Sequence, residues 1–127
     1  MTTPARNDGS QTVHYLRKKI TYADSGAVTV GVVPTNAIVL RGGVVVTTAF
    51  NAATTNVLDI GTSSDDDGFA TDLALGTVGV IVADEMATTD DMGPMSADTT
   101  ITATYAQTGT AATAGVGYVW IEYLPNE

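Results

Sequence analysis

The clearest pattern along the chain is an alternation of apolar and polar positions with a period of two residues, which is typical of β-strands that bury one face. In residues 27–33 (AVTVGVV), three valines alternate with Thr29 and Gly31. In residues 99–105 (TTITATY), threonines occupy one face while isoleucine, alanine and tyrosine occupy the other. Both segments therefore predict strands rather than helices.

Turn-forming residues divide the chain into segments of strand length. Residues 24–26 (DSG) separate residues 14–22 (HYLRKKITY) from residues 27–33, and this arrangement predicts a hairpin between the two segments. Further breaks fall at segments rich in turn-forming or polar residues: 34–36 (PTN), 63–68 (SSDDDG) and the long loop at 84–98.

Glycines interrupt two of the apolar segments. The pair Gly42-Gly43 lies inside residues 37–50 (AIVLRGGVVVTTAF), where paired glycines indicate a bulge, a bend or a close approach of two backbones. Two more glycines in residues 73–82 (LALGTVGVIV) make a helix unfavourable there. With a final strand expected in residues 115–124, the pattern predicts seven or eight strands. We therefore expect an all-β fold, a β-sandwich with jelly-roll connections, whose strand order the pattern leaves open.

The length of 127 residues fits one domain. Residues 1–11 are polar and lack periodicity, so we expect a flexible, extended N-terminal arm followed by a single β-sandwich domain over residues 12–127. The absence of cysteine excludes disulfides, a thiolate zinc site and a cysteine nucleophile. No apolar run reaches the roughly 18–20 residues of a membrane-spanning helix, so we expect no membrane partner.

The net charge of -9 is unevenly distributed along the sequence. All five basic residues lie in the first third of the chain: Arg6, Arg17, Lys18, Lys19 and Arg41. Every charged residue after Arg41 is acidic, which excludes the basic groove that nucleic-acid binding requires. The basic residues of the N-terminal part are candidates for binding a negatively charged partner. The run at 17–19 is equally consistent with an edge strand protected against aggregation.

Candidate chemistry is sparse. His14 is the only histidine and no G-x-S-x-G motif is present, so we expect neither an enzyme nor a bound cofactor. Clustered carboxylates beside a glycine turn make Asp65 and Asp67 weak candidates for cation ligands. The apolar residues that follow Gly68 do not supply the closing glutamate of an EF-hand, and a solvated acidic turn without metal is the favoured interpretation.

Several segments resemble the small capsid decoration, or cement, proteins of tailed bacteriophages. They are V-x-V-G-x-x-P at residues 28–34, VVVTTAFN at 44–51, LDIGTSSDDDGFA at 58–70 and the ending TITATYAQTGTAATAGVGYVWIEYL at 100–124. The resemblance implies a virion protein with a jelly-roll or sandwich fold that binds the outside of an icosahedral capsid. It also implies a homo-oligomer, with a trimer favoured, that ties neighbouring major capsid subunits together.

On this interpretation, residues 1–11 are the first candidates for contacts with the capsid or with another subunit, and the loop methionines Met86, Met92 and Met95 are further candidates. The alternative is a host-receptor or carbohydrate-binding module of a phage tail fibre or spike. Tyr118 and Trp120, which share one face of a predicted strand, are possible sugar-binding residues, although core or sheet-surface positions are the more usual interpretation. The chain contains no fibre repeat that would favour this alternative.

Overall fold

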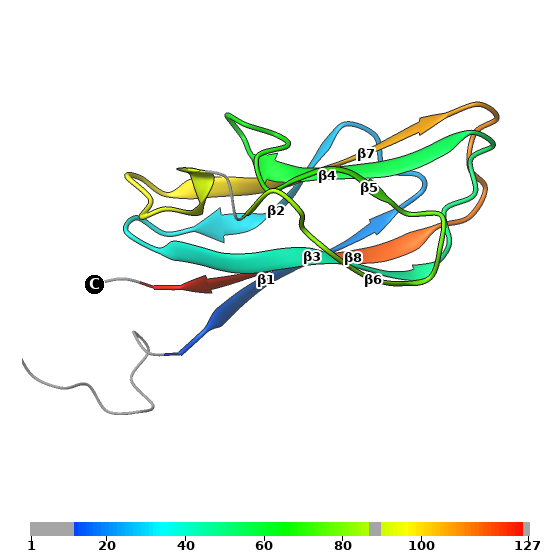
Figure 1. Ribbon diagram of the computed structural model, residues 1–127. Helices are drawn as coiled ribbons and strands as arrows, with labels where there is room; N and C mark the ends of the chain where they lie inside the picture. Colours follow the sequence, from blue (N-terminus) through cyan, green and yellow to red (C-terminus); the bar gives the residue numbers. More distant parts are fainter. Residues whose placement is uncertain (1–11, 87–89, 126–127) are drawn as a thin grey trace, which may run out of the picture.

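The structure, a computed structural model, describes residues 12–86 and 90–125. These residues form eight strands and one short 3-10 helix (Figure 1), which are β1 (His14–Thr21), β2 (Ala27–Val33), β3 (Ile38–Thr48), β4 (Thr55–Thr62), β5 (Ala70–Ala74), β6 (Gly79–Val82), η3 (Asp90–Met92), β7 (Thr99–Thr108) and β8 (Val116–Leu124). The all-β prediction is therefore confirmed. No helix within the described residues is long and apolar enough to cross a membrane.

The strands form two antiparallel four-stranded sheets that pack face to face (Figure 1). One sheet has the order β1-β8-β3-β6 and the other the order β2-β7-β4-β5. The chain alternates between the sheets except at the β4–β5 connection, and this strand order is that of a jelly roll. The predicted β-sandwich with jelly-roll connections is thus confirmed, and the strand order that the sequence left open is established.

The predicted hairpin between residues 14–22 and 27–33 is wrong. β1 pairs with β8, whereas β2 pairs with β7 in the opposite sheet. In the connecting turn the Thr21 backbone N–H donates to Asp24 Oδ2 at 2.8 Å, and Gly26 has a φ of 72° that favours glycine. The turn therefore carries the chain from one sheet to the other. A two-residue period reports a buried face but not the identity of the neighbouring strand.

The core lies between the inner faces of the two sheets. Its largest fully buried side chains are Phe69, Ile20, Leu58, Ile60, Leu75, Ile101, Ile121 and the valines at 33, 39, 44, 46 and 119. Phe50 and Tyr105 extend the core, with their ring centroids 4.9 Å apart. Burying each large aliphatic or aromatic side chain contributes about 1.5–3 kcal/mol.

The two glycines of β3 allow this strand to lie close to both of its neighbours, and a close approach of backbones is one of the three alternatives that the sequence left open. A Cβ atom on Gly42 would lie 2.5 Å from Ile121 Cδ1 and 2.8 Å from the carbonyl oxygen of Trp120, both in β8. A Cβ atom on Gly43 would meet the carbonyl oxygen of Ile81 in β6. Side chains at these positions would force β3 away from its neighbours.

The sandwich has two lateral edges. At one edge β1 lies over β2, and the Leu16 side chain packs so closely on Gly31 that an added Cβ would lie 2.8 Å from Leu16 Cδ2. At the other edge, hydrogen bonds join the segments beside β5 and β6: the Glu85 N–H donates to the Phe69 carbonyl at 3.0 Å, and the Thr71 N–H donates to Asp84 Oδ1 at 3.4 Å. Residues 73–82 are accordingly divided between β5 and β6, which belong to different sheets.

Candidate interaction surface

Aromatic and aliphatic side chains line up across the outer face of the β1-β8-β3-β6 sheet. The strand register aligns two rows, each of which begins with a cation on β1 and ends with a valine on β6: Lys19, Tyr118, Val45 and Val80, and then Arg17, Trp120, Gly43 and Val82. Residues directly opposite in antiparallel strands share one face, so these side chains form a single surface. We call this surface the apolar face.

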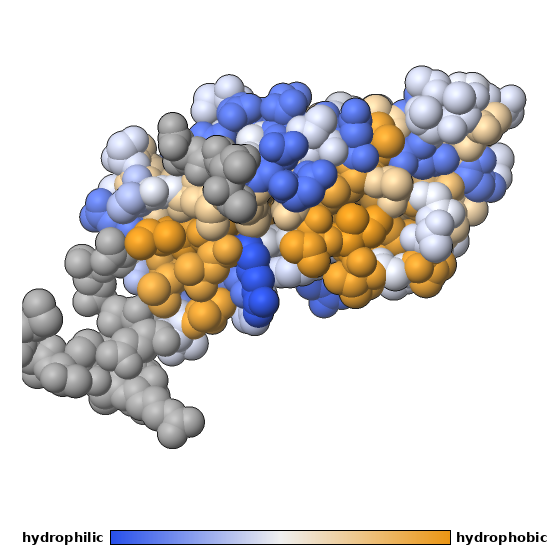
Figure 2. Space-filling view, viewed as in Figure 1, coloured by the Kyte–Doolittle hydropathy of each residue, from blue (hydrophilic) through white to orange (hydrophobic). Residues whose placement is uncertain are grey.

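The β6 end of the apolar face is strongly exposed. Val80 and Val82 have 65% and 59% of their surface exposed, and Val78, just before β6, has 61%. Val45, Tyr118 and Trp120 are half-buried beside them. Figure 2 shows apolar residues gathered over β3 and β6 on the side toward the viewer. Grouped valines that project into water are typical of a surface that binds a partner.

Toward β1 the apolar face contains a shallow hollow of about 410 Å³. It is lined by Arg17, Val45, Thr47, Tyr118 and Trp120. The Arg17 guanidinium lies 4.5 Å from the centroid of the Tyr118 ring, a cation–π contact worth about 0.5–1 kcal/mol at an exposed site. Trp120 Nε1 is buried and has no hydrogen-bond partner among the described residues. The hollow is therefore suited to binding a partner through apolar contacts and ring stacking.

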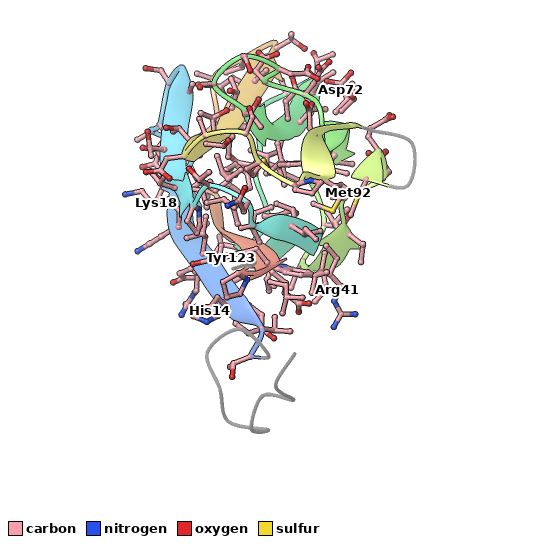
Figure 3. All side chains as sticks on the ribbon, turned by 90° about the vertical axis from the view of Figure 1, so that its left-hand side faces the viewer. His14, Lys18, Arg41, Asp72, Met92 and Tyr123 are labelled. Carbon is pink, nitrogen blue, oxygen red and sulfur yellow. The ribbon has the colours of Figure 1, made fainter. Side chains whose placement is uncertain are left out.

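An ion pair borders the apolar face. Arg41 Nε donates to Glu122 Oε2 at 2.6 Å. The Glu122 side chain is only 10% exposed, whereas the Arg41 side chain is 66% exposed. Figure 3 shows Arg41 projecting away from the sheet. The hydrogen bond to Glu122, assisted by the charge of its carboxylate, raises the pKa of Arg41. Since Tyr15, Glu122 and Arg41 are aligned by register, this pair continues the face beyond the two rows.

The basic run predicted at residues 17–19 lies on β1, at an edge of its sheet. Side chains alternate along β1, so Lys18, between Arg17 and Lys19, occupies a position that faces the core. Its side chain nevertheless reaches solvent at the rim of the sandwich (Figure 3). An inward-directed charge on an edge strand opposes pairing with a further strand. The structure thus places the run where edge protection is needed, and all three cations remain exposed. Arg6 lies outside the described residues.

The loop methionines are placed differently from the exposed contacts that the sequence predicted. Met86 and Met95 are each only 7% exposed and belong to the core, and Met92 is partly buried against it. The loop folds back on the start of β3: the Met95 N–H donates to the Ala37 carbonyl at 3.0 Å, and the Asn36 N–H donates to the Met95 carbonyl at 2.7 Å. These methionines therefore fill one end of the sandwich instead of projecting from it.

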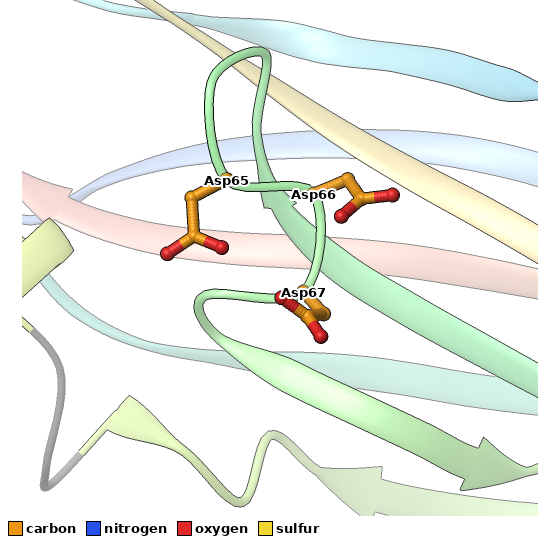
Figure 4. Close-up of side chains that lie close together, drawn as sticks. All are labelled: Asp65, Asp66 and Asp67. Carbon is orange, nitrogen blue, oxygen red and sulfur yellow. The ribbon is translucent and has the colours of Figure 1, made fainter.

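The acidic loop between β4 and β5 gathers three exposed carboxylates, those of Asp65, Asp66 and Asp67 (Figure 4). One oxygen from each lies within 4.8 Å of the others. A hydrogen bond to Asp91 raises the pKa of Asp65, because one carboxyl group must hold a proton for the two to share it. The Asp65 carbonyl already accepts the N–H groups of Thr62 and Gly68, which makes the segment a closed turn. Asp65 and Asp67 thus lie close together at the surface, in a turn that is held by its own backbone hydrogen bonds.

Sequence reasoning missed the exposed valines of β6. Their signal was the alternation of Val78, Val80 and Val82, in a segment with no charged residue. The same alternation occurs in strands that turn their valines inward, so the sequence did not distinguish the two orientations. Tyr118 and Trp120 do share one face, as predicted, and that face is the outside of the sheet.

Comparison with known proteins identifies similar folds. No protein-family model matches the sequence, and no curated protein matches it. A chain of the cyanophage Pam1 capsid asymmetric unit has a TM-score of 0.73 at 20% identity, with 98% of this chain and 93% of that chain covered. A chain of the acidic stable capsid of Helicobacter pylori bacteriophage KHP30 has a TM-score of 0.63 at 12% identity, with 91% and 89% covered.

A third similar chain comes from the capsid of Ralstonia phage GP4. Its TM-score is 0.64 at 17% identity, and the match covers 100% of this chain and 92% of that chain. The likeness in all three cases therefore extends over nearly the whole jelly roll. At these identities it establishes the fold.

Proposed function

We propose that this protein is a non-enzymatic virion structural protein of a tailed bacteriophage. In this role it binds the outer surface of an icosahedral capsid and stabilises contacts between major capsid subunits, as a homo-oligomer for which we favour a trimer. The observation that carries the proposal is the likeness of the whole chain to chains in three phage capsid structures. The arm at residues 1–11 lies outside the described residues and remains a candidate for contact with the shell.

The apolar face supports this role because it carries strongly exposed apolar side chains that would gain from being covered. Transfer of apolar surface from water contributes about 25 cal/mol per Å², and the exposed valines at the β6 end have no cover within the described residues. A single such contact is modest. Many copies on one shell, each touching more than one subunit, raise the overall avidity by about 10²–10⁴ without any single tight site.

The test is co-sedimentation of purified protein with undecorated capsid shells. We expect saturable binding at a copy number related to the symmetry of the shell, and greater resistance of decorated shells to heat. The double variant Val80→Asp/Val82→Asp should weaken binding by about 100-fold, because two charges would be buried against the shell. Thr29→Asp is the matched control on the exposed outer side of β2 and should bind as wild type does.

Two results would refute the proposal. One is a wild-type protein that does not sediment with shells. The other is that decorated shells resist heat no better than undecorated shells. Loss of binding in both the valine variant and the Thr29→Asp control would show that added negative charge acts generally, and would remove the apolar face from the proposal.

One observation favours the alternative function, a carbohydrate-binding module of a tail fibre or spike. The hollow of about 410 Å³ places Arg17 beside Tyr118 and Trp120, and aromatic rings of this kind stack on sugars. This function predicts saturable binding of host glycans by the isolated protein, accompanied by a change in fluorescence of Trp120, the only tryptophan. Glycan binding without shell binding would replace the capsid proposal by this one.

A further inference from the structure

Opposite charges occupy opposite edges of the sandwich. The β1 edge carries Arg17, Lys18 and Lys19, all exposed. Exposed carboxylates cluster around β5 and just after β6, at the other edge, and are those of Asp65, Asp66, Asp67, Asp72 and Asp84. We call these two regions the basic edge and the acidic edge. The stacking of β1 over β2, with β5 and β6 at the far ends of their sheets, places them on opposite sides of the molecule.

The three cations of the basic edge form no ion pair within the part of the chain that is described. Arg41, the remaining described cation, is already paired with Glu122. The surrounding chain is strongly acidic, with a net charge of -9. Three adjacent cations on such a chain are therefore available to an acidic partner.

The acidic edge is correspondingly crowded with like charges. Asp59, on β4 beside this edge, accepts the Asp72 N–H at 2.8 Å. Burial first, and then the negative charges of Asp72, Asp67 and Asp66, raise the pKa of Asp59. These carboxylates thus lie close enough to repel one another, and cations brought against them would relieve that repulsion.

We propose that copies of this chain associate head to tail, with the basic edge of one copy against the acidic edge of the next. A symmetric contact between two basic edges or two acidic edges would place like charges together, whereas the head-to-tail contact places opposite charges together. Such a heterologous contact forms a closed ring when its rotation closes, and a trimer is one such ring. The inference is independent of capsid binding, because it concerns the free protein.

The contact is formed by side chains rather than by extension of a sheet. Lys18 blocks the addition of a strand to β1, as argued above. At physiological ionic strength charges are screened over about 8 Å, so the overall repulsion between two acidic chains is largely removed while contacting charges still attract. Association should therefore weaken when salt is raised from about 0.15 M to about 1 M.

The test uses two charge-reversal variants of the full chain in analytical ultracentrifugation. Lys18→Glu/Lys19→Glu reverses the basic edge, and Asp66→Lys/Asp67→Lys reverses part of the acidic edge. Each variant alone should associate about tenfold or more weakly than wild type. An equimolar mixture of the two should associate again, at least in pairs of unlike variants, because the reversed edge of each variant then meets the complementary edge of the other. Recovery on mixing excludes misfolding and net charge as causes.

The control Thr110→Glu/Ala111→Glu adds negative charge to exposed positions after β7, away from both edge strands, and should associate as wild type does. A wild-type protein that stays monomeric at every concentration overturns the inference, as does association that survives both reversals. If reversal of the basic edge weakens shell binding but not self-association, the partner of that edge is the capsid and the head-to-tail contact is wrong. Monomeric protein that still decorates shells would overturn this inference and the oligomeric part of the proposed function, and would leave capsid binding standing.

Discussion

The outer faces of the two sheets differ although their inner faces are alike. Across the β1-β8-β3-β6 sheet a row runs from Lys19 through Tyr118 and Val45 to Val80, so that it is largely apolar. Across the β2-β7-β4-β5 sheet, a corresponding row is small and polar, and contains Ala27, Thr104 and Asp59. Both inner faces are built from buried valine, isoleucine and leucine.

This difference separates the requirements of folding from those of binding. An antiparallel sheet in a sandwich needs one apolar face, and its other face is ordinarily polar where it meets water. The β2-β7-β4-β5 sheet follows that rule. The β1-β8-β3-β6 sheet is largely apolar on its outer face as well, and the valines at its β6 end are exposed. The apolar face is therefore the surface that the proposed partner would cover, and the following five predictions test the comparison between the two outer faces.

The largest effect is expected from Gly43→Ala. The new Cβ would meet the Ile81 carbonyl and push β6 away from β3, which should lower the free energy of unfolding by about 1–3 kcal/mol. Because β6 carries the exposed valines, shell binding should fall with it. Gly76→Ala is the control, since a Cβ there meets nothing within 4 Å. Chemical denaturation measures the stability of both variants. If Gly43→Ala were as stable as Gly76→Ala, β6 would not pack against Gly43 as closely as the structure shows.

The next effect concerns the ion pair at the border of the apolar face. Arg41→Ala leaves the Glu122 carboxylate, only 10% exposed, without its partner. Thermal stability should fall because a nearly buried carboxylate loses its partner, but by less than in Gly43→Ala, because water screens the exposed guanidinium of Arg41. The double variant Arg41→Ala/Glu122→Gln should recover part of the loss in thermal unfolding. No recovery would mean that Arg41 contributes through packing rather than through charge.

Trp120→Phe should change little. It keeps an aromatic ring on the apolar face and removes an N–H that has no partner among the described residues. Removing a buried donor without a partner should stabilise the fold, whereas the smaller ring buries less apolar area and should destabilise it. The two effects oppose each other, so we expect the free energy of unfolding to change by less than about 1 kcal/mol. Urea denaturation followed by circular dichroism measures this. A much larger loss would indicate that Nε1 makes a hydrogen bond.

The smallest effect is expected on the polar face, at Asp59. Burial raises the pKa of Asp59, so its contribution to stability is full below the unfolded pKa of about 3.9 and is lost as the pH rises through the folded pKa. Asp59→Asn retains an oxygen that accepts the Asp72 N–H, and should make the fold slightly more stable than wild type at neutral pH. Melting temperatures between about pH 3 and pH 7 test this.

Asp98→Asn should have the opposite effect on stability from Asp59→Asn, because the pKa of Asp98 is lowered rather than raised. Hydrogen bonds from the Thr35 N–H and hydroxyl lower the pKa of Asp98. Its contribution to stability is therefore present above the unfolded pKa and is lost as the pH falls through the folded pKa. The Asn variant should be less stable than wild type at neutral pH and should approach it in acid. The same pH dependence for both variants would contradict the assigned causes.

Much of the local structure was predictable from the sequence. Residues 27–33 form β2 with the predicted bounds, and residues 37–50 contain β3. The acidic turn at 63–68 was also predicted correctly, and the close approach at Gly42-Gly43 was one of three alternatives that the sequence offered for that pair. These features depend on side-chain alternation and on the turn preferences of a few adjacent residues, which act over short stretches of chain.

The candidate surface was less predictable. Arg17, Lys18 and Lys19 were recognised as an edge or a docking patch, and the structure places them on an edge strand. Met86 and Met95 were candidates for partner contacts but are buried, and hydrogen bonds of the Met95 backbone hold that part of the loop against the start of β3. A methionine in a loop looks the same in sequence whether the loop projects or folds back.

The sequence by itself determined an all-β sandwich, the extent of its main strands, an acidic body with all its cations near the N-terminus, and the absence of cysteine chemistry. Only the tertiary structure decided that β1 pairs with β8 rather than β2, and that β8, β3 and β6 align their outward residues into one apolar face. The physical reason is the distance along the chain between the residues that interact. Alternation and turns are local properties, whereas strand order and register arise from contacts between residues distant in the chain, and those contacts determine which surface faces a partner.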